Sequence, residues 1–300
     1  MESLSNRRLG ERLFGVWRRS ADWIRKRVLA HRVRPPLYQG SVLDDVIFAQ
    51  PVNIPLRILR WFARLRPARW GEVTVVIVNF NTLEFMKKVC QAVREMSPEG
   101  TEIIVIDNAS RDGSWDWLRQ RPFGVRAVRV PTNIGHGRAL DIGLFLSRSE
   151  YVVTLDSDAF PFSSRWIETI IDPLSRPGFL GSGAWGPRGR LHPACSAFRR
   201  RTVLDAGLSF QNYNLHRDLG QDPVFGENTW DTGELLFEWL GRDRVVLHDA
   251  VPTEWGWGVV IGGVVYHHTG GTTGITDDPE QLLRKKARLW NEAITKLTGD

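Results

Sequence analysis

Apolar and polar residues alternate in blocks along residues 73–161. Four blocks rich in Val and Ile are predicted as strands, and the first of them is a continuous β-branched run, as expected for a strand that is buried on both faces. These blocks are 73–81, 101–107, 125–130 and 151–155. The stretches between them with helical periodicity are 83–96, 112–120 and 133–149. Strands that alternate with helices form βαβ units, so the pattern predicts an α/β fold with a Rossmann-like, mostly parallel sheet.

The pattern is looser after Pro161. Short strands are expected at 192–198 and 259–268, and a helix at about 232–240. The chain is therefore predicted to hold one domain, with a nucleotide-type half and a mixed half that shapes the pocket for a partner. The predicted divisions are 1–70 for an N-terminal helical extension and 71–300 for the domain, split into 71–165 and 166–300.

The extension is basic and amphipathic. Apolar residues recur at helical spacing in 1–30 and 55–70, with Arg and Lys between them. Residues 1–70 hold 15 Lys and Arg against 5 Asp and Glu, a balance of +10, and the whole chain carries +6, which leaves −4 for residues 71–300. Such a segment is typical of docking on an anionic membrane surface. The alternatives are a helical arm packed on its own domain and a dimer contact. Nucleic acid is disfavoured as a partner because no groove-reading motif is present.

Cysteine content and hydropathy indicate the compartment. Cys90 and Cys195 have no C-x-x-C spacing, which argues against a disulfide framework and a structural zinc site. The longest weakly polar run, Trp255–Tyr266, has 12 residues and is too short to span a bilayer. The N-terminus shows no apolar signal region. We expect a cytoplasmic protein that lies peripherally on the inner face of the membrane.

Polar residues follow the ends of the predicted strands. In a doubly wound sheet, ligands bind outside the carboxyl ends of the strands, so these residues are expected on one rim. The rim residues are Asn79, Phe80, Asn81, Asp107, Asn133, Asp156, Ser157 and Asp158. Asp156 and Asp158 are one residue apart on extended chain and can share a hard divalent cation, Mg²⁺ or Mn²⁺. The alternative for this pair is a polar turn that ends the strand.

The remaining rim residues suit a nucleotide. The carboxylate of Asp107 can accept hydrogen bonds from a nucleobase or ribose, and the ring of Phe80 can lie against the base. Gly135 and Gly137 allow close approach of the backbone at a helix start, where Arg138 adds positive charge for phosphate. The segment "GHGRAL" is not the dinucleotide fingerprint, and no P-loop, H-E-x-x-H or G-x-S-x-G motif occurs.

Four segments in order resemble a known family. "VTVVIVNFNT", "EIIVIDNASRDGS", "VPTNIGHGRALDIG" and "YVVTLDSDAFP" are similar to the nucleotide-sugar half of glycosyltransferase family 2, and in particular to its rhamnosyltransferase-like members. The resemblance implies the GT-A fold and a nucleotide-sugar donor. It also implies that Asp107 contacts the base, that Asp156 lies at the ribose and the metal, and that Asp158 coordinates the metal.

Two later motifs carry the other implied roles. Members of the family use an acidic motif at a helix start as general base, which falls here at "ENTWDTGELL". Trp230 stands at the usual glutamate position, so Asp231 is the candidate base and Glu234 the second candidate; helix capping by Asp231 is the alternative. "VVYHHTGGTTG" resembles the family's histidine motif, whose histidine completes the metal site. His267 matches it better than His268, and an imidazole ligand suits Mn²⁺ better than Mg²⁺.

The resemblance implies an inverting, metal-dependent glycosyltransferase that acts on a hydroxyl acceptor in cell-surface or lipid-linked glycan synthesis. The acceptor is expected between the strand at Cys195 and the aromatic loop 255–257. A non-catalytic nucleotide-sugar or glycan-binding protein of the same fold is the first alternative, because the acidic motif is altered. A sugar transferase that acts on nucleic acid is the second.

Overall fold

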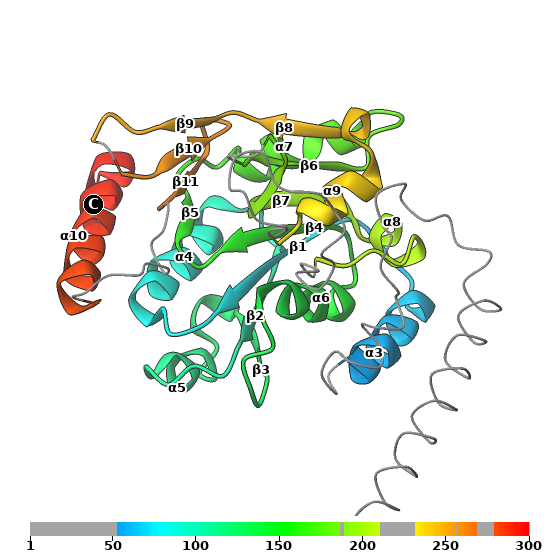
Figure 1. The fold of residues 1–300 in the computed structure, drawn as a ribbon, viewed down its shortest axis with the longest axis horizontal. Coiled ribbons are helices and arrows are strands. Elements are labelled where there is room, and N and C mark those ends of the chain that lie inside the picture. Colours follow the sequence, from blue (N-terminus) through cyan, green and yellow to red (C-terminus); the bar gives the residue numbers. More distant parts are fainter. Residues whose placement is uncertain (1–52, 187–188, 211–231, 256, 269–278, 300) are drawn as a thin grey trace, which may run out of the picture.

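A seven-stranded sheet forms the centre of the computed structural model, which describes residues 53–186, 189–210, 232–255, 257–268 and 279–299 (Figure 1). Its strands are β1 (Arg69–Asn79), β2 (Glu102–Asp107), β3 (Arg126–Arg129), β4 (Ser149–Asp156), β6 (Gly181–Trp185), β7 (Leu191–Arg199) and β8 (Val245–His248). They lie in the order β3-β2-β1-β4-β7-β6-β8. The first four are parallel to one another, and β7 is antiparallel to both β4 and β6. The α/β fold class with a mixed second half is confirmed.

Helices cover both faces of the parallel strands. The connecting helices are α4 (Leu83–Met96), α5 (Ser114–Leu118) and α6 (His136–Leu146). Alternate residues of β1 serve two cores: Val75 and Ile77 pack on the same side as α4, while Val76 and Val78 pack on the same side as α6. Gly143 permits the close contact of α6 with β1, since a Cβ there would lie 2.1 Å from Val76 Cγ1.

The second half adds a small sheet of four strands. These are β5 (Ala159–Pro161), β11 (Val265–His267), β10 (Val259–Ile261) and β9 (Ala250–Pro252), all antiparallel to their neighbours. The prediction of one strand over 259–268 is wrong. Gly262 and Gly263 have φ angles of 55° and 71° and turn the chain into a hairpin, a conformation that glycine adopts without a Cβ clash.

Helices of the second half surround these sheets. They are α7 (Trp166–Ile171), α8 (Arg200–Asp205), α9 (Glu234–Leu240) and α10 (Pro279–Thr298), with short 3₁₀ turns at Asp172–Ser175 and Arg242–Arg244; a further 3₁₀ turn, Pro122–Gly124, precedes β3 in the first half. The predicted helix at about 232–240 corresponds to α9. The long helix α10 was not predicted. Its Trp290 is buried against Phe85 of α4 and Phe160 of β5, with ring centroids 4.9 and 5.0 Å apart.

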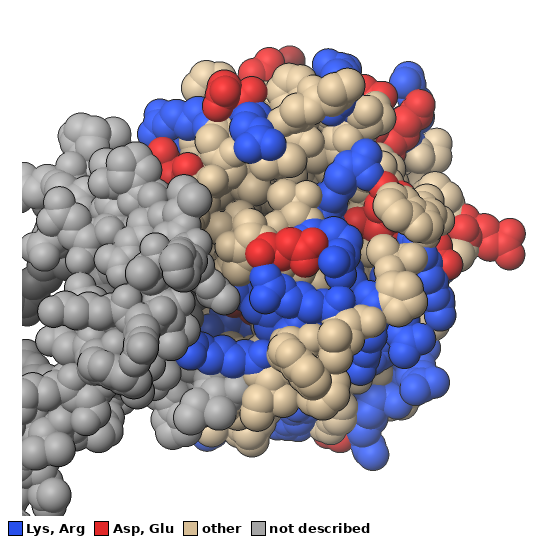
Figure 2. Space-filling model, turned by 90° about the vertical axis from the view of Figure 1, so that its right-hand side faces the viewer, with Lys and Arg blue, Asp and Glu red and all other residues tan. Residues whose placement is uncertain are grey.

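Part of the predicted extension forms the helix α3 (Asn53–Leu65). It packs on α6 and α8 through Ala63, which is buried, and through the partly buried Leu56 and Leu59. Figure 2 shows the side of the molecule that carries these helices, where Lys and Arg gather over the middle and lower part. The predicted helix 1–30 lies outside the described residues, and the division at residue 70 stays a prediction. None of the helices within the described ranges is long and apolar enough to cross a membrane.

Candidate functional site

The site forms where β4 ends and meets β11. Asp156 is the last residue of β4, and Asp158 precedes β5. Because β5 pairs with β11, Ala159 lies opposite His267, and the backbone N–H of His268 donates to the carbonyl of Asp158 at 2.9 Å. This ladder brings residues that are more than a hundred positions apart in sequence to the same place.

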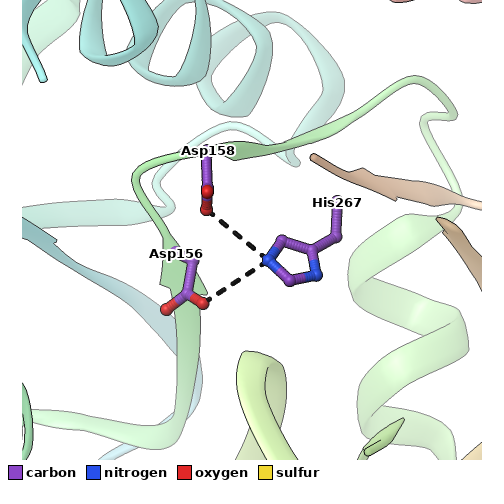
Figure 3. A group of neighbouring side chains, drawn as sticks. All are labelled: Asp156, Asp158 and His267. Carbon is purple, nitrogen blue, oxygen red and sulfur yellow. Dashed lines mark ion pairs between the residues drawn. The ribbon is translucent and has the colours of Figure 1, made fainter. Parts of the chain in front are cut away.

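Asp156, Asp158 and His267 point toward one another (Figure 3). His267 Nε2 lies 3.5 Å from Asp158 Oδ1 and 3.7 Å from Asp156 Oδ2. One ligand atom from each residue lies within 4.8 Å of the other two. Among the described residues, Oδ1 of Asp156 is buried with no hydrogen-bond donor. Two carboxylates and one imidazole, with an oxygen left without a donor, fit a divalent cation.

The charges of the three groups reinforce one another. Burial would raise the pKa of Asp158, but the hydrogen bond from His267 and the nearby histidine charges outweigh it and hold that pKa below its usual value. Burial would lower the pKa of His267, yet the hydrogen bond to Asp158 and the charges of both aspartates raise it. The pocket therefore favours the negative form of Asp158 and a positive charge beside it, which is also what a cation needs.

His268 faces the opposite way. Its Nδ1 lies 2.8 Å from the hydroxyl of Tyr266, and its ring packs against Phe85, Trp257 and Trp290. Burial lowers the pKa of His268 to about 4, so it is a neutral ring at physiological pH. Adjacent residues on a strand point to opposite faces, and here His267 is the one beside the aspartates.

Asp107 lies on the same rim at the end of β2. It is fully buried, and its Oδ1 accepts a hydrogen bond from Asn79 Nδ2 at 2.8 Å. Its Oδ2 is 3.4 Å from Arg129 Nε, and the Arg129 guanidinium lies over the Trp115 ring at 5.6 Å from the centroid. Asp107 is therefore a fixed carboxylate between an amide and an arginine.

The predicted asparagines of this rim mainly stabilise its loops through hydrogen bonds. Asn81, with a φ of 56°, accepts a hydrogen bond from the backbone N–H of Arg111, and Asn133 accepts one from Asn108. Phe80, by contrast, is exposed at the rim. Ser157 is buried in the turn between the two aspartates.

Arg138 lies on the first turn of α6. Its Nη1 is 3.4 Å from the carbonyl of Ile134, and its positive charge acts on Asp141 of the same helix. Arg138 thus lies near a helix start, and its contact with phosphate stays a prediction.

The acidic motif is described only in part. Asp231 lies outside the described residues. Glu234 is the first residue of α9 and is buried, with an oxygen 3.8 Å from Nη1 of Arg190. Arg190 also donates from Nε to Glu238 at 2.9 Å. Glu234 thus belongs to an ion-paired group that fixes α9 to the β6–β7 hairpin.

Three residues at the site were not among those predicted. His136, at the start of α6, has its Nε2 3.4 Å from the free oxygen Oδ1 of Asp156. The ring of His192 on β7 lies 5.5 Å from that of His267. Lys286 of α10 is buried; burial lowers its pKa and the charge of Asp158 opposes the shift. Only His136 had a sequence signal, since it stands between two glycines at a helix start.

The predicted acceptor region is only partly open. Cys195 is buried in β7, and burial raises the pKa of its thiol. Trp255 and Trp257 are partly buried, with the ammonium groups of Lys296 and Lys285 over their rings at 4.9 and 5.4 Å from the centroids. Each of the two indole rings therefore already has a lysine of α10 over one face.

Comparison with known proteins agrees with the resemblance found in the sequence. Residues 74–201 match the family model of glycosyl transferase family 2. An uncharacterized glycosyltransferase of Nostoc sp. (strain PCC 7120) is 26% identical over 91 residues, which are 29% of this chain and 28% of that protein. The chain thus spans less than a third of this curated relative.

Solved structures of several sugar transferases are similar at low identity. A mannosyltransferase from Pyrobaculum calidifontis in complex with GDP-Man and Mn²⁺ is 19% identical, with a TM-score of 0.42, over 53% of this chain and 58% of that one. Glucosyl-3-phosphoglycerate synthase from Mycobacterium tuberculosis is 17% identical, with a TM-score of 0.45, over 81% and 84%. TarS of S. aureus with UDP-GlcNAc is 14% identical, with a TM-score of 0.45, over 75% and 67%.

Proposed function

We propose that this chain, whose residues 74–201 match glycosyl transferase family 2, is a glycosyltransferase that takes a sugar from a nucleotide-sugar donor. The observation that carries the proposal is the cluster of Asp156, Asp158 and His267 at the carboxyl end of β4. It stands at the edge of a parallel sheet where nucleotides bind in doubly wound folds.

Asp156, Asp158 and His267 would hold a divalent cation. Such an ion, when bound, neutralises the charge that develops on the leaving diphosphate of a donor. The imidazole among the ligands favours Mn²⁺ over Mg²⁺, which prefers oxygen ligands alone. His136 and Lys286 add further positive or hydrogen-bonding groups beside the same carboxylates.

The donor is proposed to lie along the rim from β2 to β4. Asp107 accepts hydrogen bonds from the base, Phe80 covers the base, and Asp156 reaches the ribose. Asn79, Asn81, Asn133 and Ser157 hold the loops around the donor in place, and Arg138 faces the phosphates. The fixed position of Asp107 between Asn79 and Arg129 supports this assignment, because a rigid acceptor discriminates better among bases.

Asp231 is proposed as the general base. It removes the proton from an acceptor hydroxyl, the oxygen attacks the anomeric carbon, and the bond to the diphosphate oxygen breaks on the opposite face, with inversion. Glu234 remains the second candidate. Its ion pair with Arg190 favours a positioning role, since one of its oxygens already lies against the guanidinium.

The finer properties are also proposals. The transferred group is a hexosyl or deoxyhexosyl residue, and the acceptor is a glycan or a lipid-linked glycan. The chain works in the cytoplasm, peripherally on the inner face of the membrane, as the basic residues of 1–70 suggest.

A screen of nucleotide-sugars tests the proposal. The full chain is mixed with UDP-, GDP- and dTDP-sugars, with Mn²⁺ or with EDTA, and both binding and release of the nucleoside diphosphate are measured. Binding and hydrolysis that require the cation support a transferase. Binding without hydrolysis or transfer for every donor supports the non-catalytic alternative, which the tryptophan at position 230 favours. No binding of any donor contradicts both.

A further inference from the structure

The helix α3 has two faces of different character. Its inward face packs on the domain through Leu56, Leu59 and Ala63. Its outward face is apolar as well. Ile58, Trp61, Phe62 and Leu65 follow the spacing i, i+3, i+4, i+7 of one helical stripe, and they are 53%, 57%, 49% and 63% exposed. Trp70, just beyond the helix, is 81% exposed.

This outward stripe is unusual within the molecule. The described residues include nine exposed large apolar side chains, and five of them are these residues. Single exposed apolar residues are normal, whereas a contiguous group with two tryptophans and a phenylalanine on one short segment marks an interaction surface.

The stripe is held rigidly. Arg60 donates from Nη1 to the carbonyl of Gly207 at 2.6 Å, and Arg64 donates from Nε to that of Leu204 at 2.9 Å. In the other direction, buried Arg200 donates to the carbonyl of Ala63 at 2.8 Å. These bonds tie α3 to α8 and the residues after it, so the apolar stripe is preformed and its side chains need no folding step to be presented.

Arginines flank the stripe. Arg57 is exposed on the helix itself, and Arg66 and Arg69 follow its C-terminus. The backbone N–H of Arg69 donates to the carbonyl of Arg148, and Arg201 donates to the carbonyl of Arg64, so both of these arginines lie beside the end of α3.

The charges are close enough to act on one another. Burial, followed by the positive charges of Arg201, Arg66 and Arg148, lowers the pKa of Arg200 to about 10. Asp205 and Glu72 pair with arginines of this group, and Glu150 accepts a hydrogen bond from the backbone N–H of Gly71, next to Trp70. Arginines therefore outnumber carboxylates around the stripe, in agreement with the basic area in Figure 2.

We propose that the outward face of α3, formed by Ile58, Trp61, Phe62 and Leu65, docks on an anionic lipid bilayer together with Trp70 at the start of β1. Aromatic and aliphatic side chains enter the boundary between headgroups and acyl chains, and the flanking arginines contact lipid phosphates. The inference goes beyond sugar transfer, because it assigns the docking role to one rigid face of the domain.

Charge favours an anionic bilayer over the two other candidates for covering this face, which are residues 1–52 and a second copy of the chain. Residues 1–52 hold 10 Lys and Arg against 5 Asp and Glu, a balance of +5, so they would meet the arginines with like charge. A second copy of the chain that used the same face would place the arginines against themselves. An anionic bilayer supplies both an apolar layer and the opposite charge.

In Figure 1, α3 lies at the lower right and β5 and β11 lie to the left, so docking through α3 is expected to leave the site uncovered.

Vesicle binding tests the apolar contribution. The full chain is sedimented with vesicles of phosphatidylcholine alone and with vesicles that contain about 30% phosphatidylglycerol. Binding is expected only to the anionic vesicles and is expected to weaken with salt. Trp61→Ala combined with Phe62→Ala should reduce the apparent affinity at least about tenfold. The matched control is Trp185→Ala, since this tryptophan of β6 is 52% exposed elsewhere on the domain. It should bind like the wild type.

A fluorescent label tests the position of the face directly. Cys90 and Cys195 are buried, and burial raises the pKa of both thiols, so a cysteine introduced by Leu65→Cys can be labelled selectively. An environment-sensitive dye at this position should shift to the blue on anionic vesicles, and the same dye at Trp185→Cys should not.

Three results would overturn the proposal. The first is wild-type vesicle affinity in the Trp61/Phe62 variant. The second is a dye at position 65 that stays in water while the protein is bound, which assigns docking to residues 1–52. The third is a dye that is already blue-shifted without vesicles, which shows that another segment or a second copy covers α3. In that case, sedimentation equilibrium distinguishes a covering segment of the same chain, which leaves a monomer, from a second copy, which forms a dimer. None of these measurements requires sugar transfer, so they are independent of the proposed activity.

Discussion

The two halves of the domain place their functional residues by different means. In the first half, four parallel strands each end at the same edge, so Asp107 and Asp156 reach the site directly from β2 and β4. In the second half, His267 reaches the site only because β11 pairs with β5. The position of Glu234 depends on its ion pair with Arg190, a residue of the β6–β7 hairpin. The first half thus provides most of the rim residues, and the second half adds His267 from a segment that is distant in the sequence.

This difference predicts whether a substitution in each half should change the chemistry alone or the chemistry and the structure together. A residue at a strand end of the first half is held by backbone on both sides, so its replacement changes chemistry with little change in structure. In the second half, His267 and Glu234 hold position through strand pairing and an ion pair, so their replacement should alter both. The four predictions below compare the halves, from the largest expected effect on turnover to the smallest.

Asp158→Asn should have the largest effect. It removes one of two carboxylates from the proposed cation site, and charge neutralisation by a cation contributes several kcal/mol, or roughly 10⁴-fold in rate. Turnover should fall by about that factor, and donor binding should lose its dependence on Mn²⁺. Assays of nucleoside diphosphate release measure both. Asp116→Asn, on an exposed carboxylate of α5, is the control and should be unchanged. Full activity of the Asp158 variant, or of the wild type in EDTA, contradicts the cation role.

Asp231→Asn tests the second half. An acceptor hydroxyl needs a base, and a positioned base contributes about 10²- to 10⁴-fold. We expect turnover to fall by that amount while donor affinity and folding stay near normal. Glu234→Gln should reduce turnover much less and should lower thermal stability, because it breaks the pair with Arg190. The reverse result, with Glu234→Gln inactive and Asp231→Asn active, shifts the motif by three residues.

The sequence predicted the first half well for a physical reason. Strands that are buried on both faces are apolar without interruption, and α4 has the predicted bounds of Leu83–Met96 because its apolar face is regular. The second half was less predictable. The hairpin at Gly262 and Gly263 looked like one strand, since two short apolar runs flank it. The helix α10 is rich in Lys and Arg, and its anchoring depends on Trp290 meeting rings of distant segments.

The site shows the same contrast. Asp156 and Asp158 were predicted as cation ligands from their place on the common rim of strand ends and from the family resemblance, and the structure places them beside His267. The nearby Lys286 had no signal, because nothing in the sequence says where a lysine of a C-terminal helix will lie. The family resemblance ranked His267 above His268, and the β5–β11 register is what turns His267 toward the aspartates.

Paired variants of the two histidines sharpen the comparison at the contact between the halves. His267→Gln should weaken Mn²⁺ binding at least about tenfold, since it removes the proposed third ligand. His268→Gln should leave Mn²⁺ affinity nearly unchanged and should lower stability, because it puts an amide among Phe85, Trp257 and Trp290. Mn²⁺ titration followed by electron paramagnetic resonance, with thermal melts of each variant, measures the two effects. Equal loss of Mn²⁺ affinity in both variants contradicts the separate roles.

The smallest effect on turnover is expected at Asp141, where the halves are joined away from the site. Asp141 of α6 accepts hydrogen bonds from the hydroxyl of Ser209 and the backbone N–H of Phe210. Burial raises the pKa of Asp141 to about 6, although Arg60 and these hydrogen bonds oppose the shift. Because the folded-state pKa lies above the unfolded value, the native state holds the proton more tightly. The resulting stability is present below about pH 4 and is lost as the pH rises through about 6.

Urea unfolding between pH 4 and pH 7 measures this link between the halves. A shift of about two pKa units corresponds to at most about 3 kcal/mol of pH-dependent stability. Asp141→Asn has no proton to lose between pH 4 and pH 7, so its stability should change less over this range than that of the wild type, by up to that amount. Turnover at pH 7 should be unchanged, since Asp141 lies on the part of α6 that faces Ser209. Asp116→Asn, an exposed control, should keep the wild-type slope. An unaltered slope in the Asp141 variant would mean that the carboxylate is charged throughout and that Arg60 outweighs burial.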